Sequence, residues 1–108
     1  MYAIAFDLDT QKLQELYHVT TWQDAYTDVA RELQRLGFTR KQGSVYFGNE
    51  TVTPVTCVMA VQAIAVKYPW FQPSVTDIRM LRIEELNDLA PAIEQAVAMK
   101  KGNFHTGE

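Results

Sequence analysis

The chain has 108 residues, of which 47% are apolar and 21% are charged, and its formal net charge at pH 7 is −3. A chain of this length forms one domain that buries roughly two-thirds of its unfolded surface, so it needs neither metal nor disulfide to hold its core. Because Cys57 is the single cysteine, a disulfide-rich secreted domain is excluded and a reducing compartment, the cytoplasm, is expected. No apolar run approaches the ~20 residues of a membrane span, and Asp7 and Asp9 come too early for a signal peptide.

The charges are distributed unevenly along the chain. Residues 1–30 carry five acids and one base, residues 31–82 carry seven bases and three acids, and residues 83–108 carry five acids and two bases. A basic middle between acidic flanks can form a positive surface for a polyanion after folding. Ordinary solvated charge and salt bridges to the many acids explain the same pattern.

The first expected element is a strand over residues 2–8, because its large apolar side chains alternate with Ala3, Ala5 and Asp7. A weaker helical spacing follows in residues 13–17. Residues 22–36 then place apolar side chains at three- and four-residue steps, which predicts an amphipathic helix. Thr21 with Asp24 resembles a capping box at its start, and Gly37 is suited to the left-handed residue at its end.

The middle of the chain predicts a hairpin and a second helix. Residues 38–41 and 44–47 are strand-like and flank Gln42-Gly43, which is typical of a tight turn. Thr53-Pro54 is an N-cap followed by proline at the first helical position, so a helix is expected over 54–68. This helix is apolar almost all round, which predicts burial on more than one side, by its own sheet and by a second subunit.

The last third predicts one more strand and one more helix. Pro69 ends the helix, and Trp70 and Phe71 open an aromatic loop that stacks on bases, covers the core or contacts a second subunit. Residues 75–84 are strand-like, and Asp88 caps a final helix that runs to about residue 99. We expect a single domain over residues 1–101 and a frayed tail over 102–108.

The order β-α-β-β-α-β with a C-terminal helix predicts the α+β class and a ferredoxin-like antiparallel sheet. In its usual strand order the first strand lies between the third and the fourth. The end of the first strand, with Asp7, should therefore lie beside the start of the fourth, with Asp77. A parallel pairing of the first and third strands would place Ser44 level with the start of the first strand rather than with Asp7.

Asp7 and Asp77 are the candidate catalytic pair. Two neighbouring carboxylates recruit a divalent cation or share a proton, and either property suits acid–base chemistry. The structural alternative is that Asp7 binds backbone N–H groups in the following turn, a role that Asp9 can fill equally well. Cysteine and histidine metal spacing, a Gly-x-Ser-x-Gly elbow and a phosphate-binding lysine loop are all missing from the sequence.

Basic and polar residues near the hairpin are candidate substrate contacts. Ser44 follows Gly43 and shares a strand face with Tyr46 by alternation. Arg79 shares a face with Asp77, two residues away. Arg79, Arg40 and Lys41 can together hold phosphate groups, although salt bridges account for them equally well.

Several stretches, in order, resemble one known family, namely residues 1–8, 23–28, 37–38, 42–46, 74–79 and 82–84. They are similar to the virulence-associated protein D (VapD) family of bacterial proteins over residues 1 to about 95, although segment 9–21 departs from the family's usual run. The resemblance implies a fold similar to the CRISPR-associated ferredoxin-like endoribonucleases, a homodimer, and an RNA-cleaving toxin, in some members paired with an antitoxin protein. The family's aspartate, serine and aspartate match Asp7, Ser44 and Asp77.

The resulting hypothesis is a homodimeric endoribonuclease, the toxin of a toxin–antitoxin pair, that cuts single-stranded RNA. Asp7 acts as a general base toward the 2′-OH or as a ligand of Mg²⁺, and Asp77 tunes or shares its charge. Ser44 positions the scissile phosphate. Electrostatic or substrate contacts are expected from Arg79, Arg40, Lys41 and Tyr46. The alternatives are a non-catalytic dimeric adaptor for nucleic acid or protein, and a toxin that acts on a protein target.

Overall fold

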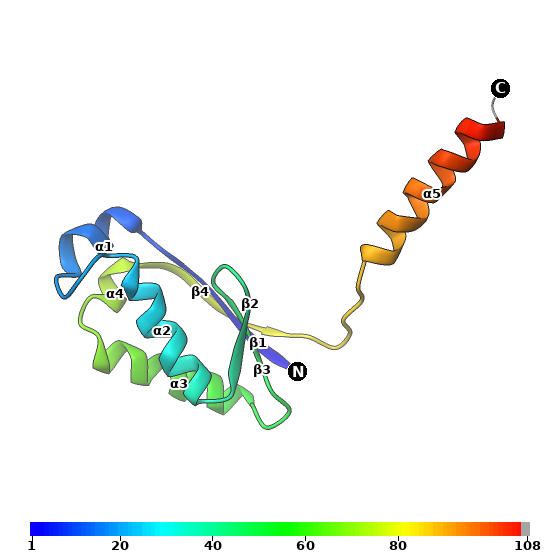
Figure 1. The fold of residues 1–108 in the computed structure, drawn as a ribbon. Helices are drawn as coiled ribbons and strands as arrows, with labels where there is room; N and C mark the ends of the chain where they lie inside the picture. The colour runs from blue at the N-terminus through cyan, green and yellow to red at the C-terminus, as the bar shows by residue number, and fades with distance from the viewer. Residues whose placement is uncertain (107–108) are drawn as a thin grey trace.

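The structure is a computed structural model that describes residues 1–106 (Figure 1). Its elements in chain order are β1 (Tyr2–Leu8), α1 (Thr10–Leu16), α2 (Asp24–Arg35), β2 (Phe38–Gln42), β3 (Val45–Gly48), α3 (Pro54–Lys67), α4 (Phe71–Ser74), β4 (Val75–Arg82) and α5 (Ala90–Thr106). Of the tail predicted to fray, residues 107–108 lie outside the described range, and fraying of the rest stays a prediction. None of the helices described in residues 1–106 is long and apolar enough to cross a membrane.

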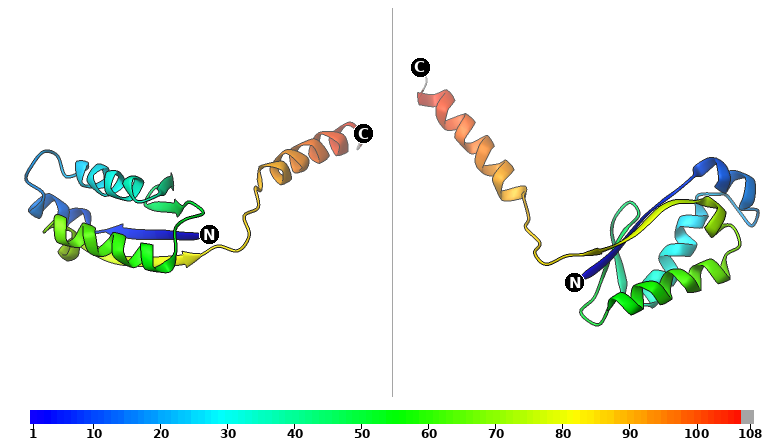
Figure 2. Two further views of the ribbon diagram at one scale, coloured as in Figure 1. Left: turned by 90° about the horizontal axis from the view of Figure 1, so that it is seen from below. Right: turned by 180° about the vertical axis from the view of Figure 1, so that it is seen from behind.

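The four strands form one antiparallel sheet in the order β2-β3-β1-β4. The predicted ferredoxin-like α+β fold with a C-terminal helix is therefore confirmed, as is the central place of β1. Helices α2 and α3 cover one face of the sheet, whereas α5 projects away from the body at the end of an extended segment (Figures 1 and 2). No helix described in residues 1–106 covers the other face of the sheet (Figure 2).

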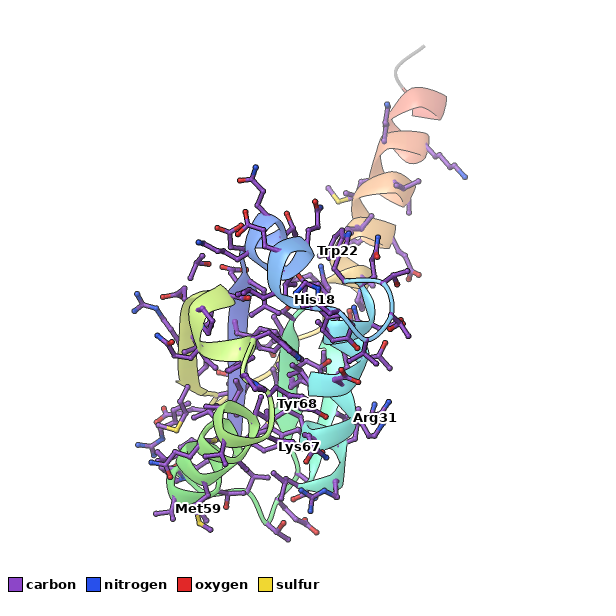
Figure 3. The ribbon with its side chains drawn as sticks, turned by 90° about the vertical axis from the view of Figure 1, so that its left-hand side faces the viewer. His18, Trp22, Arg31, Met59, Lys67 and Tyr68 are labelled. Atoms are coloured by element: carbon purple, nitrogen blue, oxygen red, sulfur yellow. The ribbon has the colours of Figure 1, made fainter. Side chains whose placement is uncertain are left out.

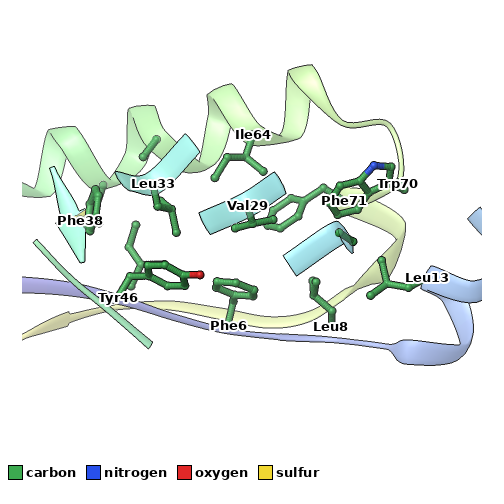
Figure 4. Packing of buried hydrophobic residues seen from close by; sticks show 14 of the residues in the cluster. Phe6, Leu8, Leu13, Val29, Leu33, Phe38, Tyr46, Ile64, Trp70 and Phe71 are labelled. Atoms are coloured by element: carbon green, nitrogen blue, oxygen red, sulfur yellow. The ribbon is translucent and has the colours of Figure 1, made fainter. Parts of the chain in front are cut away.

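Alternation along β1 decides which side chains meet the helices. Ile4, Phe6 and Leu8 are buried beneath α2 and α3, whereas Asp7 is exposed on the open face. The Phe6 ring stacks on Tyr46 with the ring centroids 6.0 Å apart, and both belong to the core shown in Figure 4. Burial of each such side chain contributes about 1.5–3 kcal/mol.

The aromatic residues after α3 also belong to the core. Trp70 is 8% exposed and Phe71 is 4% exposed, and the Trp70 ring packs edge-on against Tyr17. They start the short helix α4 and close the end of the core beside Leu13 (Figure 4). Of the roles considered for these rings, the structure supports the cover over the core, because both side chains are buried within one chain and neither is open for stacking on bases.

Two expectations about helix ends have different outcomes. Gly37 has φ +98°, so the predicted left-handed residue after α2 is confirmed. The predicted capping box is wrong, because α2 begins at Asp24 after Gln23, which makes no side-chain cap. Asp24 instead accepts a hydrogen bond from the Thr20 hydroxyl at 2.5 Å. The sequence pattern placed this start two residues too early, at residue 22 instead of Asp24.

Helix α3 begins as expected, with Thr53 as the N-cap and Pro54 as the first helical residue, and Thr56 completes a reciprocal capping box with Thr53. Within one chain a single side of this helix is covered, and burial of the other side by a second subunit stays a prediction. Cys57, Ala60 and Ile64 are buried, whereas other apolar side chains on the helix are largely exposed, namely Val55, Val58, Met59 and Val66. The second apolar side of α3 is therefore open.

A buried carboxylate joins the two covering helices. Glu32 on α2 is 4% exposed and accepts hydrogen bonds from Arg35 at 2.8 Å and from Lys67, at the end of α3. Lys67 lies on the side of α3 that faces α2 (Figure 3). The hydrogen bond from Lys67, followed by that from Arg35, lowers the pKa of Glu32 from 4.5 to about 2 despite its burial.

Glu32→Gln is expected to lower the melting temperature at pH 7, because it removes a charge that two cations contact. A carboxyl whose folded pKa is lowered stabilises the protein above its unfolded pKa, and this contribution disappears as the pH falls from about 4.5 to about 2. The melting temperatures of wild type and variant should therefore converge over that range. A difference that stays constant between pH 7 and pH 2.5, or an equal loss in the exposed control Glu50→Gln, would contradict this role.

Candidate active site

The pairing of β1 with β4 sets two carboxylates opposite each other. Asp7 and Asp77 are register partners in this antiparallel pair, and both are exposed on the open face. Residues directly opposite in such a pair have Cβ atoms roughly 4.5–5.5 Å apart. The predicted juxtaposition of the end of β1 with the start of β4 is confirmed.

A β-bulge lies directly after this pair. The register steps from Asp7 opposite Asp77 to Leu8 opposite Val75, so Thr76 has no partner in β1. The Thr76 hydroxyl donates a hydrogen bond to the backbone carbonyl of Asp7 at 3.2 Å. Bulges bend a strand and redirect side chains beside them, and this one fixes the backbone at the carboxylate pair.

Ser44 lies beside the same end of β1. Strands β1 and β3 run antiparallel, so the parallel pairing considered from the sequence is wrong, and Ala5 rather than an earlier residue pairs with Val45. The Phe6 N–H donates to the Ser44 carbonyl at 3.1 Å, which places Ser44 next to Asp7. An open hollow of about 360 Å³ is lined by Ala5, Phe6, Asp7, Gly43, Ser44, Val45 and Asp77.

The two carboxylates differ in their partners. The Arg79 Nε donates to both carboxylate oxygens of Asp77, at 3.1 and 3.2 Å. Within residues 1–106 the side chain of Asp7 accepts no hydrogen bond and forms no ion pair. Asp7 is therefore the carboxylate that is free to accept a proton or to bind a cation.

Asp9 fills the turn role that was an alternative for Asp7. It is the N-cap of α1, where its side chain accepts hydrogen bonds from the N–H groups of Gln11 at 2.9 Å and Lys12 at 3.2 Å. Its own N–H donates to the Ser74 carbonyl at 2.7 Å. Asp9 therefore has the structural role of accepting backbone N–H groups in the turn, and Asp7, two residues earlier, does not.

Tyr26 lies on α2, where helical periodicity assigns it to the core face, and it is not among the residues that line the hollow around Asp7. Its side chain is half-buried, and burial followed by the negative charge of Asp7 raises the pKa of its hydroxyl. The phenol is therefore within electrostatic reach of Asp7 and stays protonated at neutral pH. Helical periodicity predicts that Tyr26 lies on the apolar face of α2. No pattern in the sequence predicts that α2 lies near the end of β1.

The remaining predicted contacts have distinct positions. The Arg40 Nε donates to the Gly43 carbonyl at 2.7 Å and so holds the hairpin turn. The Lys41 ammonium lies 5.8 Å from the centre of the Phe47 ring, on the exposed hairpin. Tyr46 is 2% exposed, lies in the core and is not among the residues that line the hollow. Most other bases of the middle segment are paired with acids, as the solvated-charge interpretation predicted.

The carboxylate pair has the number of oxygen ligands that a hard divalent cation needs from the protein, but one of the two carboxylates is already bound by an arginine. Mg²⁺ binds through one or two carboxylates and completes its shell with water and substrate phosphate oxygens. Asp7 and Asp77 offer that number of carboxylates, although Arg79 already contacts both oxygens of Asp77. Residues 1–106 contain no cluster of three or more His, Cys, Asp or Glu side chains for a cation held by protein ligands alone.

The fold and the site define a small ferredoxin-like domain with acid–base groups at one end of its central strand. The chain is 54% identical over 93 residues to Endoribonuclease VapD 2 of Riemerella anatipestifer, which covers 86% of this chain and 99% of that protein. It is 49% identical over 94 residues to Endoribonuclease VapD homolog of Helicobacter pylori, covering 87% and 97%. It is 36% identical over 96 residues to Endoribonuclease VapD of Dichelobacter nodosus, covering 89% and 100%. No family model matches the chain.

The chain belongs to the VapD family. The predicted family is therefore confirmed.

The different partners of Asp7 and Asp9 predict opposite effects on stability. Asp9→Ala removes the cap of α1 and should lower the free energy of unfolding by about 0.5–2 kcal/mol. Asp7→Ala removes a charge that faces a like charge, so it should leave that free energy unchanged or raise it by up to about 1 kcal/mol. Urea denaturation of both variants measures this. A loss in Asp7→Ala as large as that in Asp9→Ala would make Asp7 a structural residue.

Proposed function

We propose that the protein is an endoribonuclease that cleaves single-stranded RNA, with Asp7 as the general base. The observation that carries the proposal is the unpaired carboxylate of Asp7, opposite Asp77 and next to Ser44 in an open hollow. The similar proteins of R. anatipestifer and H. pylori bear the name endoribonuclease, which supports the same activity here.

In the proposed reaction the Asp7 carboxylate takes the proton of a ribose 2′-OH. The 2′ oxygen attacks the adjacent phosphorus, and the bond from phosphorus to the 5′ oxygen breaks. The leaving 5′ oxygen takes up a proton from water and the protonated Asp7 releases its proton to water, so the products end in a 2′,3′-cyclic phosphate and a 5′-OH. A general base within hydrogen-bond reach contributes typically 10²–10⁴-fold to such a step.

The other site residues have supporting roles in this proposal. Ser44 positions the phosphate from the hairpin edge of the hollow. Asp77 accepts hydrogen bonds from the Nε of Arg79 only. The terminal N–H groups of Arg79 can therefore donate to the phosphate and stabilise its charge. Lys41 attracts the flanking backbone, and Arg40 acts by holding the turn. In-line attack requires a backbone free to rotate, which favours a single strand over a stacked duplex.

A metal-dependent version uses the same residues. Asp7 with Asp77 would hold Mg²⁺, and the cation would supply an activated water and charge neutralisation. The two versions differ in their requirement for the 2′-OH, because attack by water does not need it.

The proposed biological setting is a homodimeric toxin in the cytoplasm that an antitoxin protein restrains. The open apolar side of α3 and the uncovered face of the sheet support the dimer. The toxin and antitoxin roles rest on the family resemblance, and the single buried cysteine is consistent with a reducing compartment.

Asp7→Asn is expected to slow RNA cleavage by about 100-fold or more, since it removes the base and keeps the shape of the side chain. The matched control is Asp9→Asn, two residues away, because asparagine also caps helices well and should keep nearly full activity. Cleavage of a labelled single-stranded RNA by purified protein measures both. Equal cleavage by wild type and Asp7→Asn, or no cleavage by either, would favour the adaptor alternative.

The same assay separates the two chemical versions. With Asp7 as base, EDTA leaves cleavage unchanged, and a 2′-deoxy substitution at the cleaved position abolishes it. Loss of cleavage in EDTA, restored by Mg²⁺, with the 2′-deoxy substrate still cut, would instead support the metal-dependent version.

A further inference from the structure

The floor of the hollow around Asp7 is a part of the molecule to which the proposed reaction gives no role. Ala5 lies two residues before Asp7 in β1, so strand alternation turns it to the same open face of the sheet. Ala5 pairs with Val45 on β3, and partners directly opposite each other share one face. Both side chains are half-buried and line the hollow, so its floor beside the carboxylate pair is apolar.

The small side chain of Ala5 makes this floor a recess. On its other side Ala5 pairs with Arg79, and both of its partners are larger than alanine. The recess ends two residues earlier, where Ala3 on the same face is completely buried and pairs with Phe47 and Leu81. The hollow has a volume of about 360 Å³, near the lower limit for ligand pockets, which suits one flat ring with its sugar rather than a longer segment.

The charges at the hollow select the part of an RNA that enters it. Among the described residues that line it, Asp7 and Asp77 are charged and none is basic. A phosphate group inside would face two carboxylates at short distance, whereas a nucleobase carries no charge at neutral pH. The Arg79 side chain lies on the β4 side of the floor and is 72% exposed, so a phosphate can contact it from the rim. A base therefore suits the floor, and a phosphate suits the rim.

The distance along β1 identifies which base this is. Ala5 and Asp7 are two residues apart, which is roughly 6–7 Å along a strand. In a ribonucleotide the base is attached to C1′, and the hydroxyl is on the neighbouring C2′. A base that lies over Ala5 therefore directs the 2′-OH of its own ribose toward Asp7.

We propose that Ala5 and Val45 form a nucleobase subsite, which holds the base of the nucleotide whose 2′-OH attacks. The inference rests on the proposed function, because the subsite lies beside the hydroxyl that Asp7 would deprotonate. Its contacts are made with the flat face of the ring, and every base has such a face. The subsite therefore requires a base without selecting strongly among the four bases, and it acts by orienting the ribose.

Binding of a nucleotide without cleavage tests the subsite directly. The probes are adenosine 3′-monophosphate and the same ribose phosphate without a base. We expect the nucleotide to bind about tenfold more tightly and its ring to shift the NMR resonances of the Ala5 and Val45 methyl groups. The methyl resonances of Val55, which is exposed on α3, are the control and should not move. Equal affinity for the two probes, or no shift at Ala5 and Val45, would overturn the proposal.

Ala5→Leu fills the recess and leaves the carboxylates and Ser44 in place. It should lower the affinity for adenosine 3′-monophosphate to that for the base-free ribose phosphate. The matched control is Thr39→Leu, which adds leucine at an exposed position of the same face, in register with Phe47 on the edge strand β2, and should keep wild-type affinity. Circular dichroism checks that both variants are folded. A folded Ala5→Leu protein that binds the nucleotide as tightly as wild type would contradict the subsite.

Cleavage supplies a readout that a change in folding alone would not produce. The substrate is a DNA oligonucleotide with one ribonucleotide, so that a single 2′-OH is available, and a second substrate lacks the base of that ribonucleotide. Removal of the base should lower kcat/KM about tenfold for wild type and less than about twofold for Ala5→Leu, which has already lost the subsite. An equal loss in the two proteins would count against the proposal.

The two measurements separate this inference from the proposed function. Ring shifts at Ala5 and Val45 without cleavage of the intact substrate would overturn the endoribonuclease proposal and keep the nucleotide site. Cleavage of the intact and base-free substrates at the same rate would overturn the subsite alone.

Discussion

The pairing of β1 with β4 is the constraint on which the site depends. It joins strands about 70 residues apart in the chain, in a register that runs from Tyr2 opposite Arg82 to Leu8 opposite Val75. The same register that buries Ile4 and Phe6 beneath the helices turns Asp7 to the open face and sets it against Asp77. A slip of one residue would exchange the two faces and dismantle the core and the site together. Site and core are therefore specified by one set of backbone hydrogen bonds.

The three acidic residues around the end of β1 have different roles, since two have structural partners and the third is the proposed base. Asp9 is occupied as the cap of α1, and Asp77 is contacted twice by Arg79. Among residues 1–106, Asp7 has a like charge opposite it and no hydrogen-bond or ion-pair partner for its side chain, which is a locally unfavourable arrangement. Proteins retain such conflicts where chemistry needs them. The core and the ion pairs that join α2 and α3 offset the cost elsewhere in the fold.

Much of this arrangement can be predicted from the sequence, because alternation and helix signals are local. The period-two pattern of residues 2–8 gives the faces of β1, and Gly37 and Thr53-Pro54 mark helix ends where the structure has them. The strand order then places the end of β1 beside the start of β4. These inferences needed only the side-chain period of a strand and one known topology.

The rest depends on contacts between distant segments, which local patterns do not record. The antiparallel direction of β1 and β3 brings Ser44 to Asp7, and direction is a property of the sheet rather than of either strand. The bulge at Thr76 depends on how β4 meets the end of β1. The contact of Glu32 with Lys67 joins residues 35 apart, and the start of α2 was misplaced because Asp24 bonds backward to Thr20.

If Asp7 is the general base and Asp77, its register partner, tunes or shares its charge, the two carboxylates act as one unit in RNA cleavage, and a double-mutant cycle measures this. The cleavage rate of a single-stranded RNA is measured for wild type, Asp7→Asn, Asp77→Asn and the double variant under the same conditions. When two groups act as a unit, removing either one already removes their joint contribution to the rate. We therefore expect the double variant to be no slower than the slower single variant. Losses that multiply in the double variant would show that the two carboxylates act independently and would contradict the account.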